Sequence, residues 1–351
     1  TKEIPEVDAV LGTASYGHIL DAVDGALAGQ SYLKMEPLDT LPLVNTHRMV
    51  TTGGHYAYLK IAEGCDKHCT YCIIPKLRGN FRSVPMEHLL REAKQLADDG
   101  VKEIILVAQE TTLYGKDLYG EKKLPELLRR LCKISGIRWI RILYCYPEEI
   151  TEELIQTIKE EPKICHYLDL PIQHASDDVL KRMGRRTSKE ELIHIISRIR
   201  EEIPDITLRT TLITGFPGES KEQHEELMDF VDEMAFDRLG VFTYSAEDGT
   251  PAAQMPDQVE ESVKEARRAE LMELQQEIAF DQAEQMIGRE VLVMIEGKVA
   301  DENAYVGRTY KDAPNVDGLI FVNTDTELLS GDFAKVRVTG ACEYDLIGEL
   351  M

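Results

Sequence analysis

The sequence lacks any apolar run near the roughly twenty residues that a membrane-spanning helix needs. Residues 1–5 also lack the basic segment followed by an apolar segment that marks a secretory signal. Cysteine is sparse, and seven cysteines in 351 residues, an odd number, do not suggest the framework of a disulfide-rich secreted domain. These absences argue against membrane proteins and disulfide-stabilised secreted proteins, so we expect a soluble, cytoplasmic protein.

Positive charge is also scarce, with 40 basic against 63 acidic residues and a formal net charge of -23. A surface with this charge repels nucleic acid unless a local basic patch overrides the mean, and it attracts basic proteins. An acidic surface can equally serve solubility alone. Net charge therefore leaves the partner open.

Hydrophobic residues make up 43% of the chain, and 351 residues are too many for one core of usual size. From residue 55, short β-rich runs alternate with segments that have apolar residues at helical spacing. The β-rich runs are 56–61, 103–108, 138–143, 166–170, 207–213 and 238–244, and the helical segments include 86–98, 151–159, 189–202 and 221–233. This alternation predicts parallel strands with right-handed crossovers. It fits a partial six-unit (β/α) barrel or an open doubly wound sheet, and both place ligands at the carboxyl ends of the strands.

The chain divides into three predicted regions. Residues 51–285 form the α/β body, which ends in a long charged helix that begins near residue 259. Residues 286–351 consist of short alternating segments with Gly and Asn turns, a pattern that predicts a small antiparallel β-barrel. Residues 1–50 are too few to fold alone. We expect them to be the tail of a truncated N-terminal domain plus a linker.

Three cysteines, Cys65, Cys69 and Cys72, cluster just after the first predicted strand. Three thiolates on a 4Fe–4S cluster leave one iron without a protein ligand, and that iron can chelate a small molecule. Structural zinc needs four ligands, and His68 as the fourth would crowd a tetrahedral site. A redox dithiol would leave Cys65 without a role. The motif favours the iron–sulfur cluster, with a non-enzymatic iron–sulfur or zinc protein as the alternative.

The spacing of these cysteines, with Tyr71 before the last one, resembles the motif of the radical S-adenosylmethionine (SAM) superfamily, whose fold is a partial six-unit barrel. The similarity extends to the methylthiotransferases, whose signature resembles residues 65–75 followed by Arg78-Gly79 and Arg82-Ser83. This family also carries a terminal TRAM β-barrel. The resemblance covers the chain from about residue 52 and implies SAM as a cofactor and an electron donor such as flavodoxin or ferredoxin.

Seven positions are predicted to bind the cofactor. By resemblance, Tyr71 lies near the adenine of SAM. The carboxyl end of the second strand meets the methionine amino group of SAM, and Gln109 or Glu110 could accept a hydrogen bond from that group. The alternative for Tyr71 is a partly buried aromatic residue in a loop, and the alternative for Gln109 and Glu110 is an ordinary turn. No catalytic acid–base residue is predicted, because the cofactors carry the chemistry.

The other four positions follow later strands. Gln173 and His174 are expected in the mouth of the barrel, although a lone histidine often serves only structure. Arg209 is a charge inside an apolar strand, so it needs a partner, and a ligand carboxylate is one possibility. Gly215 lies in a glycine turn that allows close approach of the adenine.

Family members act on tRNA adenosines or on an aspartate of small-subunit ribosomal protein S-twelve. The His-Ala-Ser form of residues 174–176 resembles the ribosomal-protein enzymes, since the tRNA enzymes more often carry Ser-Gly-Ser. Residues 286–351 hold twelve acidic and six basic side chains. An acidic barrel suits a basic ribosomal protein better than tRNA. The resemblance therefore implies methylthio transfer to the β-carbon of that aspartate, with tRNA modification as the alternative.

The family also has an N-terminal domain in which three further cysteines bind a second 4Fe–4S cluster that handles the sulfur. No cysteine precedes Cys65. We therefore expect a truncated chain that cleaves SAM but does not transfer the methylthio group.

Overall fold

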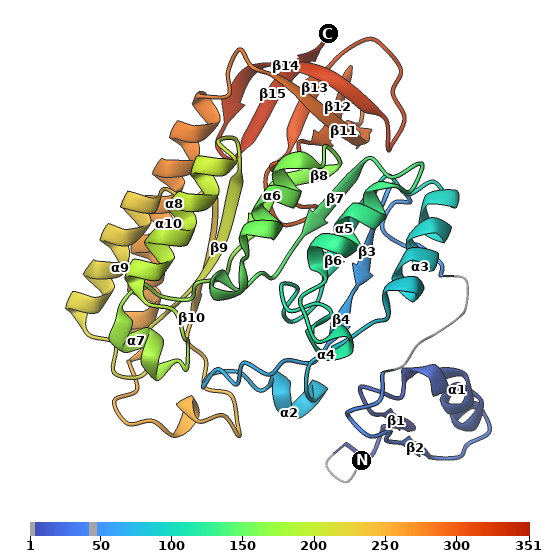
Figure 1. Ribbon diagram of the computed structural model, residues 1–351, viewed down its shortest axis with the longest axis vertical. Helices are drawn as coiled ribbons and strands as arrows, with labels where there is room; N and C mark the ends of the chain where they lie inside the picture. The colour runs from blue at the N-terminus through green and yellow to red at the C-terminus, as the bar shows by residue number, and fades with distance from the viewer. Residues whose placement is uncertain (1–3, 42–47) are drawn as a thin grey trace.

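The computed structural model describes residues 4–41 and 48–351, and its body is built on one parallel six-stranded sheet (Figure 1). The strands are β3 (Tyr56–Lys60), β6 (Glu103–Val107), β7 (Trp139–Ile142), β8 (Ile164–Asp169), β9 (Thr207–Thr214) and β10 (Arg238–Thr243). Their spatial order is β3-β6-β7-β8-β9-β10, the same as their chain order. A doubly wound sheet would reverse direction at a switch point. The predicted partial barrel is therefore confirmed, and the doubly wound alternative is wrong.

Helices connect the strands and cover the outside of the sheet. The longer ones are α3 (Met86–Asp98), α5 (Leu124–Cys132), α6 (Glu152–Glu160), α8 (Lys189–Glu202) and α9 (Lys221–Met234), and the shorter ones are α2 (Ile74–Arg78), α4 (Lys116–Tyr119) and α7 (Asp177–Arg182). In α3, Leu89, Ala93 and Leu96 recur at helical spacing and are buried in the main core. Ser188 and Ser220 each begin a helix with a capping box, which fixes where α8 and α9 start.

The long helix α10 (Glu261–Glu284) leads from the body to a closed five-stranded barrel. Its strands, in spatial order, are β11 (Glu290–Lys298), β12 (Ala304–Arg308), β13 (Ile320–Asn323), β15 (Asp345–Leu350) and β14 (Phe333–Cys342). The barrel confirms the prediction, but β13 and β15 pair in parallel, so it is not antiparallel throughout. Among the described residues, no helix has the length and apolar character needed to cross a membrane.

The N-terminal segment forms a small βαβ unit from β1 (Ala9–Leu11), α1 (Ile19–Leu27) and β2 (Tyr32–Lys34), with the two strands parallel. It lies beside α2 in Figure 1. The Thr13 hydroxyl donates a hydrogen bond of 2.8 Å to the carbonyl oxygen of Leu77. The unit therefore contacts the body at the end of the sheet that carries the cysteine motif.

The loop between β12 and β13 closes the opposite end of the sheet, where the strands begin. Arg141 donates a hydrogen bond of 2.6 Å to the carbonyl oxygen of Tyr310 in this loop. Arg238, the first residue of β10, pairs with Asp312 at 2.6 Å. Figure 1 shows the barrel at the far end of the sheet from α2. Only the carboxyl ends of the strands are therefore left for a ligand site.

Candidate functional site

The three clustered cysteines lie on a loop that leaves the carboxyl end of β3 through the short hairpin of β4 (Ala62–Glu63) and β5 (Arg82–Ser83). Cys65 and Cys69 are buried, Cys72 is partly buried, and all three thiols are free. Gly64 begins the loop with a φ of 80°, and a Cβ there would collide with the carbonyl oxygen of Asn80. This position therefore needs glycine for both conformation and space.

The thiols lie near enough to one another to interact electrostatically. Burial raises the pKa of Cys65 to about 11, and the charges of Cys69 and Cys72 add to that shift. Within the described residues, no three His, Cys, Asp or Glu side chains already stand in a metal-binding arrangement. The chemistry of the donors, three free thiols on one loop, nevertheless fits a cluster that takes three protein ligands.

Gln109 and Glu110 follow β6 and face this loop, but they have different surroundings. The Gln109 side-chain oxygen accepts a hydrogen bond of 2.8 Å from the amide of Gly64, so Gln109 holds the loop itself. Glu110 is fully buried, and its Oε1 accepts from the amide of Thr112 at 2.9 Å. Its Oε2 has no hydrogen-bond partner among the described residues. Burial raises the pKa of Glu110 to about 7. The carboxylate therefore has one oxygen free to accept from a ligand.

Lys67 joins the cysteine loop to the segment after β7. Its ammonium lies 2.5 Å from Glu149 and 3.3 Å from Glu148, in the short helix η2 (Pro147–Glu149), and 4.0 Å from Glu110. Lys67 is almost wholly buried, so these pairs are weakly screened by solvent. The contacts fix the position of the loop between Cys65 and Cys69.

His174 is enclosed by protein rather than exposed in the barrel mouth. Its Nδ1 accepts from the amide of Ser176 at 3.0 Å, and burial lowers its pKa to about 3. The imidazole is therefore neutral, and a contact between His174 and the cofactor stays a prediction. Gln173 has a φ of 73° and continues the sheet, because its amide donates to the carbonyl oxygen of Thr211 at 2.9 Å.

Arg209 and Gly215 also have neighbours within the protein. The Arg209 guanidinium lies 2.8 Å from Asp169 and 3.7 Å from Asp317, so intramolecular carboxylates take the place of the predicted ligand carboxylate. Gly215 has a φ of 69°, and a Cβ there would collide with the side chain of Lys264 on α10. Its small size serves the packing of α10. A charged residue in an apolar strand, or a glycine in a turn, indicates a close neighbour, but the sequence does not show whether that neighbour is a ligand or another part of the protein.

Tyr71 is partly buried against a small apolar cluster at the carboxyl ends of the last strands. The cluster consists of Val179, Met183, Phe216, Tyr244 and Ala252. An aromatic residue beside an apolar surface and the cysteine loop is compatible with a neighbouring adenine. This is the setting that the resemblance implies for Tyr71.

Two site residues, Tyr146 and Arg185, were missed by the sequence analysis. The Tyr146 hydroxyl lies 3.6 Å from the Cys69 sulfur, and the Arg185 guanidinium lies 4.2 Å from the centre of the Tyr146 ring. Arg185 donates to the carbonyl oxygen of Pro171 at 3.0 Å, while its Nε and Nη1 find no partner in the described part of the chain. Their only signals in the sequence were a tyrosine after the third predicted strand and a pair of adjacent arginines.

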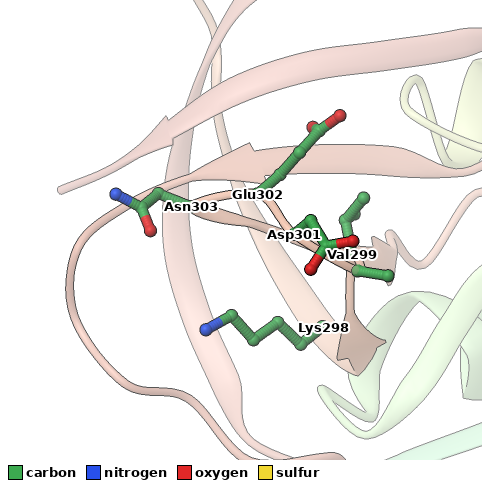
Figure 2. A pocket seen from close by; sticks show the side chains of 6 residues that line it. Lys298, Val299, Asp301, Glu302 and Asn303 are labelled. Atoms are coloured by element: carbon green, nitrogen blue, oxygen red, sulfur yellow. The ribbon is translucent and has the colours of Figure 1, made fainter.

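A hollow in the terminal barrel lies far from these residues. Figure 2 shows it at the turn between β11 and β12, where its lining residues, 298–303, all belong to one stretch of chain. The labelled side chains of Lys298 and Glu302 point away from one another. Because no groups from separate elements converge there, the hollow does not form a binding site.

Comparison with known proteins agrees with the fold. The radical SAM superfamily model matches residues 59–231, and the TRAM domain model matches residues 287–351. The chain is therefore a radical SAM protein with a TRAM domain, a class that implies a 4Fe–4S cluster and SAM. Among solved structures, it resembles the radical SAM methyltransferase TsrM from Kitasatospora setae with a TM-score of 0.48 and 16% identity, over 56% of this chain and 36% of that one. This likeness is too distant for comparing individual residues.

Three relatives identify the family. The chain is 64% identical to the ribosomal protein uS12 methylthiotransferase RimO of Lachnoclostridium phytofermentans, over 99% of this chain and 79% of that protein. The proteins of the same name are 48% identical in Desulfitobacterium hafniense, over 99% and 78%, and 50% identical in Clostridium botulinum, over 98% and 77%. The chain belongs to the ribosomal protein uS12 methylthiotransferase family.

Proposed function

We propose that this chain is a radical SAM methylthiotransferase that modifies an aspartate of ribosomal protein uS12. The observation that carries the proposal is its 64% identity to a protein of that name over almost the whole chain. The cysteine loop supports it, because three free thiols at the carboxyl end of β3 suit a cluster with one open iron. Modification of tRNA is the second candidate and is an outcome of the test below.

The proposed cluster ligands are Cys65, Cys69 and Cys72. A reduced cluster with SAM bound supplies the radical chemistry that removes hydrogen from the substrate. The protein holds the loop in place through Gln109 on the Gly64 amide and through Lys67 on Glu148 and Glu149. An external one-electron donor such as flavodoxin or ferredoxin would reduce the cluster.

Glu110 is the proposed acceptor for the methionine amino group of SAM. Its Oε2 is buried, lies 4.0 Å from the Lys67 ammonium and has no hydrogen-bond partner in the described part of the chain, so a charge-assisted hydrogen bond from a ligand ammonium would satisfy it. Tyr71 would contact the adenine. Gln173, at a strained position near the mouth, is a further candidate contact.

The terminal barrel is the proposed docking surface for the basic substrate. Five of its charged side chains form ion pairs or hydrogen bonds with described residues of the body: Glu296, Arg308, Lys311, Asp312 and Asp317. The charges that remain are predominantly acidic, which favours a basic protein over tRNA. The barrel and the cysteine loop lie at opposite ends of the sheet, so a substrate that uses both must extend along the body (Figure 1).

We propose the same domain limits that the sequence predicts: a body of residues 51–285, a barrel of residues 286–351, and residues 1–50 as the tail of an N-terminal domain plus a linker. The family models begin and end within these limits.

The test uses anaerobically reconstituted protein, dithionite, SAM and uS12 whose aspartates carry deuterium on the β-carbon. Mass spectrometry should find deuterium in the 5′-deoxyadenosine product, because hydrogen removal needs only the cluster on the cysteine loop. Cys69→Ala should give no product. Product formation stimulated by tRNA but not by uS12 would favour the second candidate. One tightly bound zinc and no iron would contradict the proposed function altogether.

A further inference from the structure

A stacked pair outside the cysteine motif, Tyr146 and Arg185, lies against the proposed cluster. Tyr146 follows β7, while Arg185 follows α7, so two separate β/α units bring them together. The guanidinium lies 4.2 Å from the centre of the tyrosine ring, well within the range of a cation–π contact. The two side chains therefore behave as one unit.

The Tyr146 hydroxyl is directed at one ligand sulfur. It lies 3.6 Å from the Cys69 sulfur, a hydrogen-bond distance for a large acceptor atom. If Cys69 is a cluster ligand it is a thiolate, which has no proton to give. The tyrosine must then be the donor.

Arg185 brings unpaired donors and a positive charge to the same place. Only 7% of its surface is exposed, and its Nε and Nη1 have no partner among the described residues. A buried guanidinium with unsatisfied donors is costly unless an anion lies nearby. A cluster with three thiolate ligands gains negative charge on reduction, so it would satisfy this requirement best in its reduced state.

We propose that Tyr146 and Arg185 set the reduction potential of the cluster, with Tyr146 donating a hydrogen bond to the Cys69 thiolate and Arg185 fixing the ring and adding positive charge. This inference rests on the proposed cluster at Cys65, Cys69 and Cys72. Hydrogen bonds to ligand sulfurs and nearby charge are known determinants of iron–sulfur potentials. Reduction adds one electron from the donor, no covalent bond forms or breaks, and the tyrosine keeps its proton.

The structure offers a matched control at the other end of the sheet. Tyr167 is also buried, its ring lies 4.7 Å from the Arg141 guanidinium, and its hydroxyl donates to Asp317 at 2.7 Å. Tyr167→Phe therefore removes a hydroxyl from a similar stacked pair that has no contact with the cysteine loop. Any general effect of losing a buried hydroxyl should appear in both variants.

The experiment is an anaerobic dithionite titration of the reconstituted protein, followed by electron paramagnetic resonance, without SAM. Tyr146→Phe should keep the iron content of the parent and shift the midpoint potential to a more negative value. Arg185→Gln should shift it in the same direction, and Tyr167→Phe should leave it unchanged. An unshifted potential in Tyr146→Phe with full iron content overturns the proposal.

Two other results also have definite meanings. If Arg185→Gln leaves the potential unchanged and instead weakens SAM binding in equilibrium dialysis, the anion that Arg185 pairs with is the SAM carboxylate, and its assigned role is wrong. If the parent protein takes up no iron, the proposed function fails first. The two failures are therefore distinguishable.

Discussion

The two ends of the parallel sheet both contain buried charge, but they differ in how that charge is satisfied. Where the strands begin, Glu103 pairs with Arg141 at 2.8 Å and with Arg308 at 2.7 Å, and all three side chains are fully buried. Where the strands end, Arg185 is buried with no carboxylate at ion-pair distance in the described part of the chain, and Glu110 Oε2 has no hydrogen-bond partner there, only the Lys67 ammonium at 4.0 Å. At the amino ends, Arg141 Nη2 and Arg238 Nε also lack hydrogen-bond partners among the described residues, but each of these arginines has a carboxylate partner. Ion pairs stabilise the contact between the body and the barrel, whereas a buried charge without an opposite charge marks a candidate position for a ligand.

The sharpest test of this difference removes a proposed cluster ligand. Cys69→Ala should abolish cluster assembly, lowering the iron content from about four per chain to near zero, with loss of the broad visible absorption. Cys342→Ala, at an exposed cysteine in the terminal barrel, is the control and should retain both. Retention of a full cluster by Cys69→Ala would remove this residue from the ligand set.

A second test removes the buried ion pairs of Arg308 at the amino ends of the strands. Arg308→Met should lower the free energy of unfolding by about 3–5 kcal/mol, because Glu103 and Glu296 each lose a buried partner. Arg337→Met removes an arginine from an exposed pair with Glu290 in the same barrel and should cost at most about 1 kcal/mol. Chemical denaturation of both variants measures the difference. Equal losses would show that the network between body and barrel contributes little.

A third test compares the buried Glu110 carboxylate with the partly buried Arg209 guanidinium as SAM contacts. Glu110→Gln should weaken SAM binding by about tenfold or more, since a charge-assisted hydrogen bond contributes about 1.5–3 kcal/mol. Arg209→Gln should leave the SAM affinity unchanged, because Arg209 is paired with Asp169. Equilibrium dialysis on reconstituted protein gives both values. The reverse result would restore Arg209 as the ligand-binding residue.

The effect expected to be smallest near neutral pH is the pH dependence that comes from His174. Burial lowers its pKa from 6.5 to about 3, so the folded state holds it neutral while the unfolded chain can protonate it. The stability from this group is complete above pH 6.5 and falls as the pH drops below that value, by about 1.4 kcal/mol per pH unit. His174→Asn keeps an acceptor for the Ser176 amide and should flatten this dependence in thermal unfolding.

Much of the fold could be predicted from periodicity and helix capping. The bounds of α3 and α8 match the structure, because their apolar faces and start signals lie in the sequence itself. The alternation of strands and helices implies α5, although no bounds were predicted for it. The short α2 was missed, and so was β15, whose parallel pairing with β13 depends on closure of the barrel.

For the site, the sequence identified the local cysteine motif but not the residues that the fold brings beside it. The cysteine motif is local, so the sequence alone identified it. Arg209 and Arg185 show the limit, because Arg209 is partly buried, Arg185 is buried, and only the fold decides which one has a carboxylate partner. Asp317, which lies 3.7 Å from Arg209, is more than a hundred residues away along the chain. No pattern in the sequence connects such residues.

The contacts of the loop between β12 and β13 also set the order in which parts of the fold can be completed during translation. Translation completes β3 through β10 before the barrel residues Arg308, Tyr310, Asp312 and Asp317 leave the ribosome. Until then, Arg141 and Arg238 lack the partners that these residues later supply. Likewise, Tyr167 cannot form its hydrogen bond to Asp317, and Glu103 cannot form its ion pair with Arg308, until these residues are translated. The nascent body therefore remains open at the amino ends of its strands until the barrel residues, which are translated later, complete its contacts.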